Sequence, residues 1–292
     1  MSWHDGCKEP GVRKAWESQR YRCMARLGRA RLAAQGENAM QNAVLIGLSR
    51  QVALERELDV VANNIANMNT TGYKADGSLF EEYLSSKART ASNGGRISFV
   101  QDRGTWHDMS GGAIERTGNP LDVAINGNGF LVVQTPQGER YTRNGSLQVN
   151  PTGQLVTAEG YPVLGDNGPI VLQRNDRQIQ ISQDGTISVR EGQANIDSQR
   201  GKLRLVGFAN TQQLQKVGAS TFSAPNGVQP TPVDTTTTRL EQGAVEKSNV
   251  RGVVEMSRMI EITRSYTQIA AMLQQQAELG QTAIDKLADV PA

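Results

Sequence analysis

Residues 54–74 read LERELDVVANNIANMNTTGYK, and this stretch determines how the chain begins to fold. Apolar residues recur in it at alternating intervals of four and three, which places them on one stripe of an α-helix: Leu54, Leu58, Val61, Ile65 and Met68. Gly72 follows a polar run and predicts the end of the helix, because glycine tolerates the left-handed turn. A helix with so narrow an apolar stripe needs a partner.

The far end of the chain offers that partner. From about Gly243 a second helix is predicted, and its apolar stripe has the same spacing: Met259, Ile262, Tyr266, Ile269 and Leu273. Ala62 and Ala66 would let a partner backbone come close, and Asn63 and Asn67 offer side-chain amides that a bundle can pair. We therefore expect an α+β fold, with the N- and C-terminal helices paired as a coiled coil.

Between these helices the pattern is typical of β-structure. From Gly118 onward, short β-rich runs alternate with Gly, Asn and Pro turns, which predicts a central antiparallel β domain of short strands. The expected strands are Phe130–Thr135, Glu139–Arg143, Leu147–Val149, Gln154–Thr157, Ile179–Ser182, Thr186–Val189 and Leu203–Phe208, with a brief helix over 210–217. Residues 73–117 show no sustained period and are interpreted as a linker or interface segment.

The first 39 residues differ from the rest. They hold eight basic and four acidic residues, a net charge of +4, in a chain whose total is +2. They lack the apolar core of a secretory signal peptide, and they contain both cysteines, Cys7 and Cys23, in a spacing that matches no zinc site. One hypothesis is a basic arm for nucleic acid or lipid. The alternative, which we favour, is that translation begins at Met40.

Three further motifs carry a resemblance. ANNIANMNTTGYK, the run TGNPLDVAINGNGFLVV with YTRNG after it, and SNVRGVVEMSRMIEITRSY resemble the bacterial flagellar rod and hook family. LSRQVALERELDVV makes the resemblance closest to the proximal rod members. It extends from Met40 to about Leu287, and the sequence departs from the family pattern at Leu131, at Thr267 and in the tail after Leu273.

The resemblance implies a structural subunit of the proximal rod that self-assembles axially and transmits torque across the periplasm. Its implied partners are copies of itself, neighbouring rod proteins and the flagellar export machinery, which would export it without a cleavable signal peptide. The resemblance and the helix pattern together predict assembly and helix-packing residues: Leu54, Leu58, Val61, Ala62, Asn63, Asn64, Ile65, Asn67, Met68, Met259, Ile262, Tyr266, Ile269 and Leu273. The β-domain motif residues are Pro120, Leu121, Asp122, Gly127, Gly129, Phe130, Tyr141, Thr142, Arg143 and Gly145.

The domain boundaries follow from these patterns. We expect a basic extension over 1–39, an N-terminal rod helix over 40–72, a linker over 73–117, a β domain over 118–242 and a C-terminal rod helix over 243–288.

Other functions are weighed against this interpretation. A phosphate-binding loop at Gly127 and Gly129 fails because a strand follows and no Lys-Ser/Thr pair accompanies the glycines. Asp122, Asp166 and Asp184 stand in turn contexts, and His107 beside Trp106 indicates packing or an interface. We expect no enzyme activity, catalytic residue, metal, cofactor, nucleic acid, membrane insertion or small-molecule substrate. The alternatives are a distal rod or hook subunit and, from another class, a β-rich periplasmic peptidoglycan hydrolase.

Overall fold

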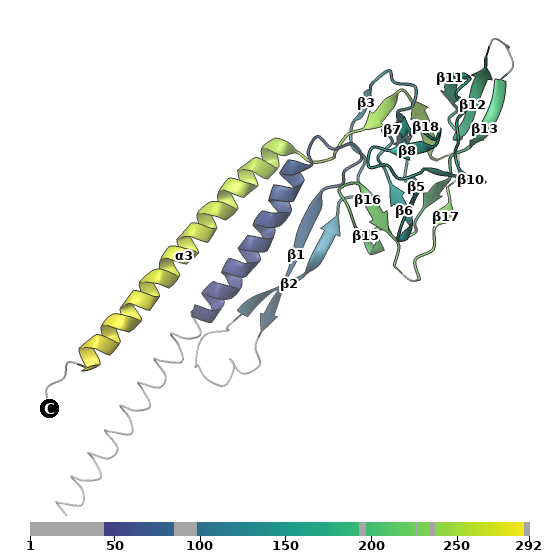
Figure 1. Ribbon diagram of the computed structural model, residues 1–292. Coiled ribbons are helices and arrows are strands. Elements are labelled where there is room, and N and C mark those ends of the chain that lie inside the picture. The colour runs from purple at the N-terminus through teal and green to yellow at the C-terminus, as the bar shows by residue number, and fades with distance from the viewer. Residues whose placement is uncertain (1–43, 85–97, 193–196, 226, 234–236, 289–292) are drawn as a thin grey trace, which may run out of the picture. The chain divides into compact units, whose positions relative to one another are not determined.

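The structure is a computed structural model that describes residues 44–84, 98–192, 197–225, 227–233 and 237–288 (Figure 1). It divides into two compact units, which are described separately. Unit 1 comprises Met1–Leu54, Phe80–Gln101 and Ser265–Ala292, and unit 2 comprises Glu55–Leu79 and Asp102–Arg264. The predicted start at Met40 and the extension over 1–39 lie outside the described residues.

Unit 2 is built mainly of short antiparallel strands. A six-stranded sheet has the order β15-β16-β6-β5-β14-β17. Its strands are β5 (Phe130–Thr135), β6 (Gly138–Thr142), β14 (Leu205–Gly207), β15 (Gln215–Lys216), β16 (Thr221–Ser223) and β17 (Thr231–Pro232). A three-stranded sheet joins β11 (Asp176–Ile181), β12 (Thr186–Glu191) and β13 (Asp197–Lys202).

Smaller antiparallel pairs complete the unit. They are β4 with β18, β3 with β19, β7 with β8, and β9 with β10. Their bounds are β3 (Ile114–Arg116), β4 (Val123–Asn126), β7 (Leu147–Val149), β8 (Leu155–Thr157), β9 (Leu164–Gly165), β10 (Gly168–Pro169), β18 (Arg239–Gln242) and β19 (Ala244–Glu246). A separate pair joins β1 (Asp76–Leu84) to β2 (Ser98–His107).

The core lies on both faces of β5. Because side chains alternate along a strand, Leu131 and Val133 enter one apolar cluster while Phe130 and Val132 enter the other. All four side chains are at most 1% exposed. This explains the apolar run over residues 130–133 of β5, since both faces of the strand are buried there and only Gln134 of β5 is exposed.

Local sequence signals predicted this part of the fold well. The predictions for β5 and β7 are confirmed to the residue, and the other expected strands overlap β6, β8, β11, β12 and β14. The brief helix expected over 210–217 is a single 3-10 turn, η1 (Thr211–Gln213), capped by the Asn210 side chain. Residues 73–117, where no period was found, contain β1, β2 and β3.

The predicted fold class is wrong in its helical part. The described residues contain one helix near each end, over 44–66 and at α3 (Gly252–Ala288), and coiled-coil pairing of the two is not seen. Of the predicted stripe on α3, Ile262 is buried and the other four residues are half-buried. Large apolar side chains off that stripe face solvent instead, with Val253 at 82% and Ile260 at 55% exposure. Apolar residues thus surround α3 on several faces, whereas a two-helix coiled coil needs them on one.

Contacts between the two helices occur within each unit. In unit 1, Gln51 Nε2 donates to Tyr266 Oη at 2.9 Å. In unit 2, Arg258 Nη2 donates to Glu57 Oε1 at 2.7 Å. Asn67, directly after the N-terminal helix, donates to the Asn63 side chain of that helix at 2.7 Å rather than to α3. No helix among the described residues has the length and hydropathy of a membrane span.

Candidate functional site

The N-terminal helix ends in a connector, residues 67–76, that is held by hydrogen bonds to the β domain. Asn64, which is 1% exposed, binds the backbone of Asp76 in both directions: Nδ2 donates to the Asp76 carbonyl at 2.8 Å, and Oδ1 accepts from its N–H at 2.9 Å. The Asn64 side chain thereby hydrogen-bonds both backbone groups of Asp76, as a neighbouring strand would do at the start of β1. Thr71 Oγ1 donates to Asn144 Oδ1 at 2.6 Å, which ties the connector to the YTRNG turn.

A buried carboxylate, Glu246, contacts residues from separate parts of the chain. Glu246, at the end of β19, is 2% exposed and lies 2.6 Å from Lys74 Nζ and 3.2 Å from Arg143 Nη1. Its Oε1 also accepts the Gly112 N–H at 2.8 Å, and its backbone carbonyl accepts the Gly72 N–H at 2.7 Å. We call Glu246, Lys74 and Arg143 the Glu246 hub.

The Glu246 hub holds two cations against one anion. Burial lowers the pKa of Lys74, and the adjacent Glu246 opposes that shift. Two further donors find neutral partners, since Lys74 Nζ donates to the Ser110 carbonyl and Arg143 Nη2 to the Gly127 carbonyl, each at 2.5 Å. Arg143 Nε is buried without a hydrogen-bond partner among the described residues. The Arg143 guanidinium also lies 5.2 Å from the Phe130 ring centroid. Charges this deeply buried are stable only while their partners remain in place.

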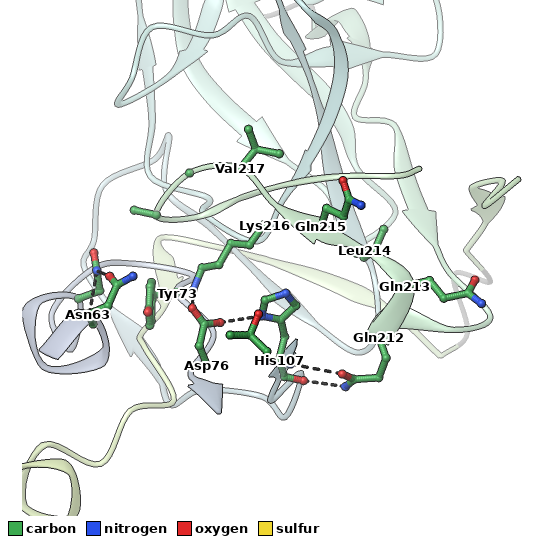
Figure 2. A pocket seen from close by; sticks show the side chains of 14 residues that line it. Asn63, Tyr73, Asp76, His107, Gln212, Gln213, Leu214, Gln215, Lys216 and Val217 are labelled. Carbon is green, nitrogen blue, oxygen red and sulfur yellow. Dashed lines mark hydrogen bonds and ion pairs between the residues drawn. The ribbon is translucent and has the colours of Figure 1, made fainter. Parts of the chain in front are cut away.

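A second charged cluster is formed by Asp76, His107 and Lys216 (Figure 2). Asp76 Oδ1 lies 2.6 Å from His107 Nδ1, and Asp76 Oδ2 lies 2.9 Å from Lys216 Nζ. Lys216 Nζ also donates to the Lys74 carbonyl at 2.9 Å and lies 3.6 Å from the Tyr73 ring centroid. These contacts connect β1, β2 and β15 through the connector.

Electrostatics within this cluster follows from its burial. Burial lowers the pKa of Lys216, although Asp76 opposes the shift. Burial and the nearby Asp76 raise the pKa of Tyr73, which remains a neutral phenol. For Asp76 itself, burial would raise the pKa, but hydrogen bonds from His107 and Lys216 outweigh it and hold the pKa below its ordinary value of 3.8.

The depressed pKa of Asp76 predicts acid sensitivity. A carboxyl group whose pKa is lower in the folded state stabilises the fold above the unfolded-state pKa and loses that contribution as the pH falls through the folded-state value. We therefore expect the thermal midpoint to be nearly flat above about pH 5 and to fall below about pH 4. Asp76→Asn should lower the midpoint at pH 7 and make the acid limb shallower, as measured by calorimetry.

A matched control is Asp166→Asn, at an exposed turn between β9 and β10. This variant should keep both the neutral midpoint and the acid limb of the parent chain. An Asp76→Asn chain that kept the parent's acid limb would show that Asp76 is not the group responsible.

The second cluster borders a groove of about 830 Å³. It is lined by Asn63, Asn67, Tyr73, Asp76, His107 and residues 212–219 (Figure 2). The Gln212 amide donates to the His107 carbonyl at 2.7 Å and accepts from its N–H at 3.3 Å, which fixes the end of β2 against η1. Among the described residues no three His, Cys, Asp or Glu side chains cluster as a metal site would require.

The β-domain motif residues serve turns and packing in this unit. Asp122 accepts from Thr117 Oγ1 at 2.6 Å and from Asn119 Nδ2 at 3.1 Å, so its carboxylate is occupied by its own turn. A Cβ on Gly127 (φ +122°) would lie 2.6 Å from Thr238 Oγ1, so this glycine is needed for a close approach. Tyr141 stacks edge-on against Phe208 with ring centroids 4.8 Å apart.

Comparison with known proteins identifies the three motif regions separately. Residues 45–74 match a family model described as flagella basal body rod protein, residues 124–189 the flagellar hook protein FlgE/F/G D1 domain, and residues 241–286 the flagellar basal body rod FlgEFG protein C-terminal region. The chain is 38% identical over 252 residues to flagellar basal-body rod protein FlgF of Caulobacter vibrioides, covering 86% of this chain and all of that protein. The chain belongs to the flagellar basal-body rod protein family.

Further relatives agree with this assignment. FlgF of Mesorhizobium japonicum is 34% identical over 85% of this chain and 98% of its own length. FlgG of Bacillus subtilis is 32% identical over 78% of this chain and 92% of its own length. As a member of the rod family the chain is a structural subunit, proximal or distal, and not an enzyme, and its place is the flagellar basal body.

The Glu246 hub draws one residue from each region that matches a rod-family model. Lys74 is the last residue of the first match, Arg143 lies in the second and Glu246 in the third. Sequence reasoning identified Arg143 but missed Lys74 and Glu246. The sequence signal that could have identified Glu246 is a charged residue directly after two apolar residues of a short strand. All three residues of that strand, β19, are buried. His107, interpreted as a packing residue, is 8% exposed and contacts Phe222 edge-on.

Proposed function

We propose that this chain is a proximal rod subunit that assembles with copies of itself and with neighbouring rod proteins and transmits torque across the periplasm. The observation that carries the proposal is the exposed apolar surface of α3. Val253, Val254, Met256 and Ile260 are between 46% and 82% exposed on consecutive turns. A surface of this kind on one chain is expected to be covered by protein, and in a rod subunit the cover is a neighbouring subunit.

The polar contacts of unit 2 supply the stiffness that torque transmission requires. Glu57 on the N-terminal helix pairs with Arg258 on α3, while Asn64 and the Glu246 hub fix the connector to the β domain. Asn249, just before α3, accepts the Ala75 N–H at 2.8 Å and donates to the Asp108 carbonyl at 2.8 Å. The end of the N-terminal helix and the start of α3 are thereby both attached to the β domain. A force on either helix is therefore passed to the same domain.

The proposal keeps the predicted domain boundaries and assembly residues, but not the coiled coil. The proposed boundaries are a rod helix over 40–72, an interface segment over 73–117, a β domain over 118–242 and a C-terminal rod helix over 243–288. Export through the flagellar machinery without a cleavable signal peptide belongs to the same proposal. The similarity to both FlgF and FlgG relatives supports the rod assignment, and the greater identity to the FlgF of Caulobacter vibrioides favours the proximal position.

The test is assembly of a helix-surface variant. Ile260→Asp puts a charge on the exposed face of α3 and should abolish recovery of the chain in purified basal bodies, because a neighbour would have to bury that charge. The thermal midpoint of the isolated chain should stay within about 2 °C of the parent, since a surface substitution changes stability by about 0.5 kcal/mol or less.

Ile260→Leu is the matched control, because it keeps an apolar side chain at the same site and should be recovered normally. Normal recovery of Ile260→Asp in basal bodies would show that this face of α3 is not an assembly surface.

A further inference from the structure

Asn126, the last residue of β4, and Gly127, the first residue of the loop before β5, form an accessible Asn–Gly pair. Asn126 is exposed and Gly127 is half-buried. Asn126 Nδ2 donates to Glu241 Oε1 at 3.4 Å, a long hydrogen bond that restrains the side-chain amide weakly. Glycine has no Cβ to hinder an approach to its backbone nitrogen. The side-chain amide is therefore open to attack by the main chain that follows it.

The backbone nitrogen of Gly127 is not held by the neighbouring strand. Asn126 lies opposite Arg239 in the β4–β18 ladder, while the N–H of Leu240, the next residue of β18, donates to the Gln183 carbonyl instead. Hydrogen-bonded pairs alternate along an antiparallel ladder, so Asn126 and Arg239 are such a pair and the Asn126 carbonyl faces β18. The two groups of a trans peptide point in opposite directions, so the Gly127 N–H faces away from β18. Water removes its proton without first breaking the ladder.

We infer that Asn126 is a self-modification site, at which the chain deamidates through a succinimide. The Gly127 nitrogen, after losing its proton to water, attacks Asn126 Cγ. The new N–C bond replaces the bond from Cγ to Nδ2, and the side-chain nitrogen leaves as ammonia. Water then opens the five-membered ring at either of its two carbonyls, which leaves aspartate or isoaspartate at position 126. The reaction consumes water and needs no oxidant, metal or second protein.

Asn144 and Gly145 form the same pair in a protected setting. Both residues are buried. Asn144 Oδ1 accepts from Thr71 Oγ1 at 2.6 Å and from the Ser146 N–H at 3.0 Å. The Gly145 carbonyl accepts from the Val123 N–H at 2.9 Å. Because the side chain and the backbone that follows it are both fixed, Asn144 Cγ reaches the Gly145 nitrogen only after this turn opens.

Two exposed asparagines precede glycines whose nitrogens are protected. Asn128 is followed by Gly129, which is buried, so water does not reach its amide proton. Asn167 is followed by Gly168, which pairs with Gly165 across the β9–β10 turn. The residue after Gly168 is a proline without an N–H, so that pairing uses the N–H of Gly168 itself. Among the Asn–Gly pairs that the structure describes, the pair at position 126 thus combines an exposed amide with an accessible nitrogen.

Modification at Asn126 acts on the Glu246 hub. Isoaspartate inserts one extra carbon into the main chain before Gly127, whose carbonyl accepts from Arg143 Nη2 at 2.5 Å. Either product also places a new carboxylate beside Glu241, where the two negative charges repel. The extra carbon displaces the Gly127 carbonyl from Arg143, a member of the Glu246 hub, and so lowers the thermal midpoint.

Ageing of the purified full-length chain in mildly alkaline buffer tests the site. Peptide mapping by mass spectrometry should show a gain of one mass unit at Asn126 at least about tenfold faster than at Asn128, Asn144 or Asn167, because protected sites react only through local opening. Protein isoaspartyl methyltransferase should methylate the aged chain in proportion to the isoaspartate at position 126. In concentrated urea the four rates should agree within about threefold, since the fold that distinguishes the pairs is lost.

The matched control is Asn126→Gln, which keeps a side-chain amide but would have to close a six-membered ring, a much slower reaction. Its midpoint should stay constant during ageing, while that of the parent chain falls as isoaspartate accumulates. The inference is overturned if the folded parent chain is unmodified at Asn126, if Asn144 reacts as fast, or if Asn126 still leads in urea. A midpoint that falls equally in parent and control would overturn the link to the Glu246 hub.

Discussion

Glu246→Gln is expected to lower the free energy of unfolding by at least about 3 kcal/mol, because it leaves Lys74 and Arg143 buried without an anion. Glutamine keeps the size and an acceptor oxygen for the Gly112 N–H, so the loss reports the charge. For a chain of this size the thermal midpoint should fall by on the order of 10 °C, as measured by calorimetry. Recovery of the variant in basal bodies should fall with it.

Two further variants distinguish the buried charges of the Glu246 hub from an ordinary surface ion pair. Lys74→Met should cost less than Glu246→Gln, since it leaves the Arg143–Glu246 pair balanced. Glu115→Gln breaks a pair with Lys247 in which both side chains are 54% exposed, and it should cost less than about 1 kcal/mol. A Glu246→Gln chain as stable as Glu115→Gln would mean that the buried charges contribute little to holding the connector.

Gly72→Ala should destabilise the chain by about 3 kcal/mol, since two costs add at this position. The residue has φ +67°, where a side chain costs about 1–2 kcal/mol. A Cβ would also lie 2.4 Å from the Asn144 backbone nitrogen and 2.5 Å from the Arg143 carbonyl carbon, both of which are backbone atoms that cannot rotate away. Relieving that clash costs about 1–3 kcal/mol and pulls the connector off the YTRNG turn.

Gly118→Ala isolates the second cost. Gly118 has a similar φ of +75°, but nothing lies within 4 Å of a Cβ added there. It should therefore cost only about 1 kcal/mol, the penalty for the left-handed conformation. Equal losses from Gly72→Ala and Gly118→Ala in chemical denaturation would show that the connector does not depend on this close approach.

The sequence by itself determined the features that depend on neighbours along the chain. Hairpin strands such as β5 and β7 are bounded by turn residues a few positions away, so their bounds could be predicted to the residue. The helical period of α3 and the end of the N-terminal helix before Gly72 are equally local. The family motifs are also legible in short windows, which is why the rod assignment needed no coordinates.

Only the tertiary structure decided which polar residues meet. Lys74 and Glu246 are 172 positions apart, and Arg143 and Glu246 are 103 apart, so no local pattern relates them. The coiled-coil prediction failed for the same reason. A stripe of spaced apolar residues shows that a helix face can be buried, but not which surface covers it. Val253 and Ile260 lie off the predicted stripe and are exposed in this chain, and the helical period does not encode what would cover them.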